Sequence, residues 1–168
     1  MLEPHSRGSD NLYLFQMNSQ LRVLVKESGL NEPTLDQVRF DFCFACITRI
    51  CHLLEADESI KAYSEFELYM NKLMSKPNFE RLQKSILNIA NQHPGSQSLD
   101  GARHSAVSAT YALANAINGN AIATAEYAAY SKVYGYEGYA VNDLENYQDE
   151  YFIQVKILRD LIEEFESA

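Results

Sequence analysis

The chain has 168 residues, of which 46% are hydrophobic and 22% charged, and its net charge is −9 at pH 7. This length and hydrophobic content suit one globular domain with a sizeable core, and the few glycines and prolines favour regular structure over disorder. The negative charge argues against nucleic acid as a ligand, because phosphate binding needs a basic face. No apolar run approaches the length of about eighteen residues that predicts a membrane span.

Residues 1–16 differ from the rest of the chain. Their stretch "DNLYLFQM" is close to the protease-site linker ENLYFQ of expression vectors, with an extra Leu. We interpret residues 1–16 as vector-derived and expect Met17 to be the native start. The start carries charges and no apolar region with a cleavage site, which argues against a secretory signal. We therefore expect a cytoplasmic protein with a single helical domain at 17–168.

Helical periodicity and capping residues predict four helices in the first half. Gly29 suits a left-handed C-cap, Thr34 an N-cap with Gln37 at the capping-box position, and Asn78 another N-cap. The second helix is apolar nearly all round, which is typical of a helix in the middle of a bundle. The expected helices are 18–28, 35–55, 57–75 (stopped by Lys76-Pro77), and one from Asn78 to just before His93.

Three more helices follow the loop "PGSQSLDG". Two Ala- and Ser-rich helices, 99–118 and 120 to Gly135, are joined by Asn118-Gly119 and predict a closely packed αα-hairpin. The last runs from Asn142 to about Phe165, with apolar residues at a spacing of three or four. They are Leu144, Tyr147, Tyr151, Val155, Leu158, Ile162 and Phe165. With no strand alternation anywhere, the sequence predicts an all-α bundle of about seven helices.

Cys43, Cys46 and Cys51 lie within nine residues, and the first two have C-x-x-C spacing. The surrounding run "FDFCFACITRICHLL" predicts a buried helix, and no second Cys/His pair occurs at zinc spacing. We expect buried structural thiols, and an odd number of cysteines fits a reducing cytoplasm.

Sequence motifs for catalysis are missing. No nucleophile elbow, phosphate-binding loop, zinc-protease helix or dinucleotide fingerprint occurs. We therefore expect no cofactor and no metal, and His52, Glu55 and His104 are the residues that a metal-dependent enzyme would use. Arg49 lies on the otherwise apolar second helix, so we expect it to pair with a buried acid.

The stretch "EYAAYSKVYGYEGYA" gathers five of the eleven tyrosines. Tyr127, Tyr130 and Tyr134 share one face of a helix, a pattern that is more often core than contact surface. We expect Tyr136 and Tyr139 to lie on a glycine-flanked loop, a residue mix that is typical of contact surfaces but equally compatible with a structural role.

Residues 137–166 hold nine acidic residues against Lys156 and Arg159. Asp143 and Glu145 suit the positive end of a helix dipole. Acids in the last turn and the like-charged pair of Glu145 with Asp149 weaken a helix. This unfavourable placement favours a basic partner, and solvation of the protein is the alternative explanation.

Three stretches resemble the bacterial domain-of-unknown-function family 416. "FCFACITRI" with a downstream "AY" resembles its F-x-A-C…E-R…Y opening, and "DEYFIQVKILRDLI" its closing helix. "HPGSQSLDGARHSAVSATYALANAINGN" resembles its Ala-rich hairpin. The likeness covers about residues 38–162, with Thr48 where the family has Glu and Tyr151 where it has Trp. The resemblance implies a helical fold, and Glu150 with Gln154 matches a recurrent pair that we expect to form interhelical hydrogen bonds beside the buried stripe.

The family has no established activity, but similar Ala-rich helical proteins occur among bacterial immunity proteins. We therefore hypothesise a protein that occludes a cognate, basic toxin. The expected contact residues are Tyr130, Tyr134, Tyr136, Tyr139, Asp143, Glu145 and Asp149. The alternatives are a structural or self-associating helical protein and, third, the metal-dependent enzyme named above.

Overall fold

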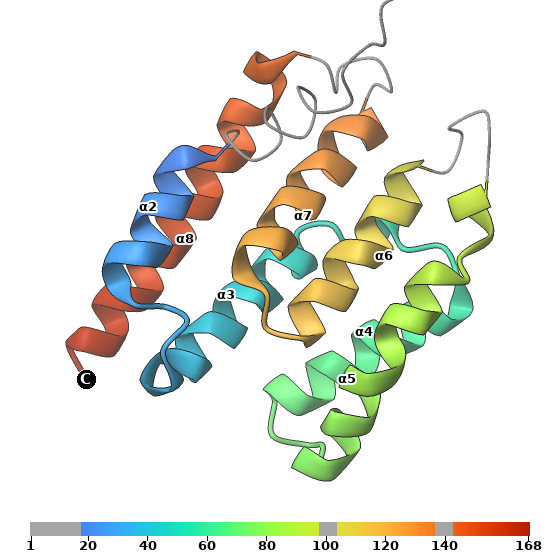
Figure 1. Ribbon diagram of the computed structural model, residues 1–168, viewed down its shortest axis with the longest axis horizontal. Coiled ribbons are helices and arrows are strands. Elements are labelled where there is room, and N and C mark those ends of the chain that lie inside the picture. Colours follow the sequence, from blue (N-terminus) through green and yellow to red (C-terminus); the bar gives the residue numbers. More distant parts are fainter. Residues whose placement is uncertain (1–17, 98–103, 137–142) are drawn as a thin grey trace, which may run out of the picture.

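A computed structural model describes residues 18–97, 104–136 and 143–168 (Figure 1). Within these ranges the chain forms seven α-helices, four short 3₁₀ helices and no strand, which confirms the all-α prediction. The α-helices are α2 (Ser19–Ser28), α3 (Asp36–Thr48), α4 (Asp57–Met70), α5 (Lys76–Asn91), α6 (His104–Ile117), α7 (Ala121–Tyr136) and α8 (Gln148–Glu166). The 3₁₀ helices are η1 (Pro33–Leu35), η2 (Cys51–Leu53), η3 (Pro94–Gln97) and η5 (Leu144–Tyr147).

Helix α3 is central to the bundle and contacts α4, α6, α7 and α8. In Figure 1, α2 and α8 lie side by side at one edge, the α6–α7 hairpin fills the middle, and α4 and α5 form the other edge. The fully buried residues Phe42, Cys43, Cys46 and Ile47 carry α3 through the core. The expected extent of this helix, 35–55, is wrong: α3 ends at Thr48, and the chain then turns through η2.

The α6–α7 hairpin is confirmed. Its turn passes through Gly119 at φ +72°, a left-handed conformation that favours glycine. Alanines fill the contact between the two helices, and Ser105 and Ser131 each donate a hydroxyl hydrogen bond to the other's backbone oxygen, at 2.9 and 2.7 Å. Small side chains therefore let the two backbones approach closely.

Gly135 does not end α7, as the sequence predicted, because the helix continues to Tyr136. A Cβ at Gly135 would lie 2.8 Å from Ser105 Oγ, closer than carbon and oxygen normally approach. The glycine therefore makes room for α6 and does not terminate the helix.

Of the other predicted capping residues, one is confirmed and two are wrong. Gly29 is the left-handed C-cap of α2, as predicted, with φ +68°. Thr34 and Asn78 are not N-caps: Thr34 lies within η1, and Ser75 caps α5 by accepting a hydrogen bond from the Asn78 N–H. Pro77 lies in the first turn of α5, where its missing N–H costs nothing, so it begins a helix and does not stop one.

Candidate functional site

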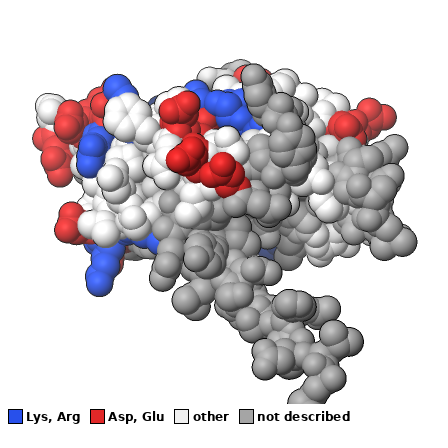
Figure 2. All heavy atoms as spheres, turned by 90° about the horizontal axis from the view of Figure 1, so that it is seen from above, with Lys and Arg blue, Asp and Glu red and all other residues white. Residues whose placement is uncertain are grey.

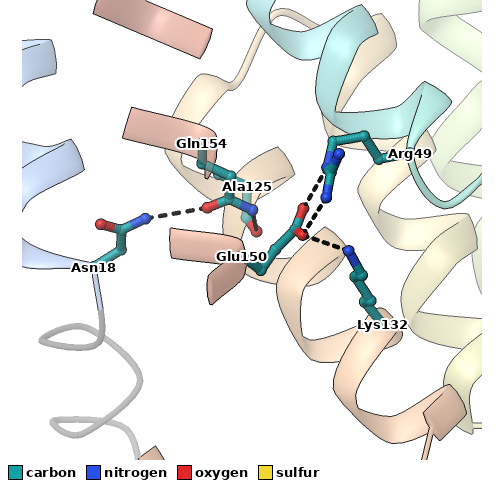
Figure 3. Close-up of polar contacts among 6 residues, drawn as sticks. All are labelled: Asn18, Arg49, Ala125, Lys132, Glu150 and Gln154. Carbon is teal, nitrogen blue, oxygen red and sulfur yellow. Dashed lines mark hydrogen bonds and ion pairs between the residues drawn. The ribbon is translucent and has the colours of Figure 1, made fainter. Parts of the chain in front are cut away.

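Arg49 binds a buried acid, as expected, and the acid is Glu150 on α8. Arg49 Nε and Nη2 donate hydrogen bonds to the two carboxylate oxygens at 2.9 and 2.7 Å, and Lys132 Nζ donates at 2.8 Å (Figure 3). Glu150 is only 3% exposed, and burial raises the pKa of its carboxyl. The hydrogen bonds and charges of Arg49 and Lys132 outweigh burial, so the pKa lies below its ordinary value. The carboxylate thus stays charged and joins α8 to α3 and α7.

Gln154 extends these contacts to α2. Its amide donates to the Ala125 carbonyl at 2.8 Å and accepts from Asn18 Nδ2 at 3.1 Å (Figure 3). Asn18 in turn caps α2 by accepting from the Leu21 N–H. Glu150 and Gln154 make interhelical hydrogen bonds as expected, and both side chains are buried, so the buried face of α8 is wider than its apolar stripe. The polar groups of Glu150 and Gln154 are therefore engaged in hydrogen bonds between helices.

Two tyrosines of the last helix region form a second small core. Tyr147 and Tyr151 are buried, their rings lie 5.6 Å apart, and they pack with Ala129 and Val133 of α7. Burial raises the pKa of both phenols above the ordinary value. These residues belong to the apolar stripe that the sequence predicted, but the two ends of that stripe, Leu144 and Phe165, are exposed.

The tyrosine face of α7 is neither fully core nor fully open. Tyr127 is exposed, and its ring stacks on that of Tyr111. Tyr130 and Tyr134 are half-buried, with their ring centroids 5.7 Å apart. The Tyr134 ring also contacts the ring of His104. Tyr130 packs on the second core, so only part of each ring faces outward.

The expected loop position of Tyr136 is wrong, because this residue is the last of α7. The Tyr136 side chain and the whole of Tyr139 lie outside the described residues. The surface defined below is therefore built from described residues alone.

The acids predicted for partner binding are all exposed. Asp143 caps η5 by accepting from the Glu145 N–H at 3.1 Å, so the final helix begins at Gln148 and not at Asn142. Glu145 and Asp149 form no ion pair within the part of the chain that the structure describes. Their structural role is thus limited to the favourable end of the helix dipole.

Two exposed apolar side chains lie on the same segment as these acids: Phe152, which the sequence pattern did not single out, and Leu144, which it placed in the apolar stripe. Phe152 is 68% exposed and Leu144 42% exposed. Phe152 follows Asp149 by three residues and therefore shares its helical face. The sequence does indicate the exposure of Phe152, because this residue falls outside the three-or-four-residue spacing of Tyr147, Tyr151 and Val155. We call Leu144, Glu145, Asp149 and Phe152 the α8-start surface.

The α8-start surface belongs to the end of the bundle that is uppermost in Figure 1. Figure 2 looks onto that end and shows acidic side chains in separate groups, some of them beside Lys or Arg side chains. Acidic, basic and uncharged side chains are thus interspersed on the described part of this face.

The residues proposed for metal chemistry come from η2, the segment after it and the start of α6, and η2 contacts α6. His52 lies in η2 and Glu55 follows it, whereas the His104 ring contacts Tyr134. Across residues 18–97, 104–136 and 143–168, no three His, Cys, Asp or Glu side chains come together as a metal site requires. Of the described helices, none is both long enough and apolar enough to cross a bilayer.

Comparisons of the chain with protein-family models, with curated proteins and with solved structures gave no match. The resemblance to family 416 therefore rests only on the stretches quoted for it.

Proposed function

We propose that this chain is a protein-binding module that contacts a basic partner through the α8-start surface. The observation that carries the proposal is the exposed ring of Phe152, which stands one turn from Asp149 and contributes nothing to the core. An aromatic side chain held outward on a fixed helix is the kind of residue that dominates binding energy at interfaces.

The scaffold behind this surface supports the proposal. The second core packs the start of α8 against α7, and the Glu150 contacts tie the same turn to α3. The backbone that carries Phe152 is thus fixed before binding, so no backbone entropy is lost there when a partner docks.

Charge supports a basic partner in particular. Glu145 and Asp149 are exposed without cationic partners among the described side chains, and the whole chain carries −9. Exposed acids at the rim of an interface speed encounter with a positively charged protein more than they add to affinity.

The specific form that we propose is an immunity protein that occludes a cognate toxin. Support comes from the Ala-rich hairpin and closing helix that resemble family 416, and from the acidity, because toxins that act on nucleic acids need a basic face. Self-association through the same surface is the competing form.

A growth assay tests this form. The product of the adjacent gene is induced in a bacterial host with wild-type protein, with the Leu144→Ser, Phe152→Ser variant, or with Leu87→Ser as matched control. Leu87 is 54% exposed on α5, away from the proposed surface. Wild type and the control should restore growth and the double variant should not. Absence of toxicity, or equal protection by all three, contradicts toxin neutralisation.

A further inference from the structure

A cavity of about 390 Å³ lies where the start of α3, the end of α4 and the start of α5 meet. Its wall is aromatic: Phe40, Tyr69 and Phe79 line it, with the Tyr69 and Phe79 rings stacked at 3.6 Å between centroids. Met70 and Met74 complete the apolar part. Methionine is flexible and polarizable, and is suited to ligands of varied shape.

Two lysines line the same cavity. Lys72 and Lys76 form no ion pair or side-chain hydrogen bond within the residues that the structure describes. Lys76 is the first residue of α5, where the helix dipole disfavours a cation. Lys72 has φ +60°, the left-handed conformation that ends α4, and its N–H donates to the Tyr69 carbonyl at 2.9 Å.

Two acids, Asp36 and Glu80, also line the cavity. Asp36 accepts a hydrogen bond from Arg39 Nη2 at 2.6 Å and is the first residue of α3, where the dipole favours an acid. Glu80 is the fifth residue of α5, beyond its first turn, and forms no ion pair among the described residues. Lys72 follows the C-terminus of α4, where the dipole favours a cation, so Lys76 is the lysine whose position the helix dipole does not explain.

We propose that this cavity binds a small amphiphilic anion, namely an aromatic or short-chain acyl carboxylate. Its apolar part would lie against Tyr69 and Phe79, and its carboxylate would accept hydrogen bonds from Lys72 and Lys76. The volume is within the range of ligand pockets, which are mostly apolar with a few convergent polar groups. The lining holds Lys72 and Lys76 with Asp36 and Glu80, so the two ammonium groups lie beside the aromatic wall in a pocket whose formal charges balance.

This proposal does not depend on the protein-binding function. The turn between α4 and α5 lies at the bottom of Figure 1 and η5 at the top, so the cavity and the α8-start surface occupy opposite ends of the bundle. Substitutions in the cavity can therefore be tested without altering the α8-start surface, and the reverse also holds.

Calorimetric titration with octanoate, octan-1-ol and octylammonium tests the proposal, because these probes share a chain and differ in charge. Octanoate should bind about tenfold more tightly than the alcohol, and octylammonium more weakly than both, if paired lysines recognise the carboxylate. The Lys72→Gln, Lys76→Gln variant should lose that advantage and keep the affinity for the alcohol. The matched control is Lys26→Gln, Lys84→Gln, which removes two exposed lysines that do not line the cavity.

Charge reversal gives a second arm. Lys72→Glu with Lys76→Glu should make octylammonium the preferred probe, and circular dichroism checks that both variants are folded. Three results would overturn the proposal. The three probes could bind equally, or octanoate could fail to bind. The third is that the control pair of Lys→Gln substitutions lowers the octanoate affinity as much as the cavity pair does. NMR shift changes confined to Phe152 and its neighbours would also overturn it, since octanoate would then bind elsewhere.

Discussion

Arg49 and Glu150 stand 101 residues apart in the sequence, and their side chains meet through two parallel hydrogen bonds of 2.9 and 2.7 Å. Parallel bonds between a guanidinium and a carboxylate fix orientation as well as distance. Lys132 adds a third bond from α7, so one buried carboxylate determines where three helices lie relative to one another.

Removing the charge of Glu150 should destabilise the fold strongly. Glu150→Gln leaves Arg49 and Lys132 without a counter-ion, and the free energy of unfolding should fall by about 3 kcal/mol, at the low end for a buried pair because both cations reach solvent. Urea titration followed by circular dichroism measures this. The matched amide substitution Asp160→Asn breaks only the exposed pair with Lys156 and should cost about 0.5 kcal/mol or less. Equal losses would contradict the structural role of Glu150.

The contribution of Glu150 should depend on pH in one direction. Its pKa is lower in the folded chain than the ordinary value of 4.5. A carboxyl with a depressed pKa stabilises the fold fully above its unfolded pKa and loses that contribution as the pH falls through the folded value. The stability difference between wild type and Glu150→Gln should therefore be constant near neutral pH and shrink below pH 4.5. A difference that grows on acidification would contradict the assignment.

Adjacent aromatic residues on α8 should respond oppositely to truncation. Tyr151 is 6% exposed and belongs to the second core, so Tyr151→Ala should lower the free energy of unfolding by about 3 kcal/mol or more. Phe152→Ala should change it by about 0.5 kcal/mol or less, because the side chain is mostly in solvent. Thermal unfolding of both variants measures this, and a large loss from Phe152→Ala would mean that its ring is packed.

The three cysteines should differ in reactivity. Cys43 and Cys46 are fully buried; burial raises the pKa of Cys43 to about 12 and that of Cys46 well above the ordinary value. Cys51 is half-buried on η2. At about pH 8, a disulfide reagent such as Ellman's reagent should titrate one thiol in the native protein and all three in urea. Rapid reaction of Cys43 and Cys46 would instead favour a redox role for the C-x-x-C spacing.

Local patterns predicted much of this fold, because they depend on neighbours in the chain. Gly29 as a C-cap and the Ala-rich hairpin follow from backbone conformation and side-chain size. Because an unpaired buried charge is costly, Arg49 on a core helix was expected to pair with an acid. Its partner is on a helix far along the chain, so the residue pattern alone did not specify Glu150, which only the family resemblance had singled out.

The binding surface was predicted less well, because exposure depends on tertiary packing. Tyr130 and Tyr134 share a face, but that face is half-covered by the second core and by His104. In the sequence, Phe152 is one of several aromatic residues on this helix. Tyr147 and Tyr151 pack into the second core, and Phe152 is exposed to solvent. The α3–α4–α5 cavity joins three segments whose meeting no local pattern indicates.

Binding of the adjacent gene's product to the α8-start surface is the most direct test of the proposed function. Calorimetry should detect a complex with wild type and Leu87→Ser. Leu144→Ser with Phe152→Ser should weaken it by at least about tenfold, as expected for the loss of aromatic and aliphatic anchors. No complex with wild type, or one whose affinity the double substitution leaves unchanged, would contradict the proposal.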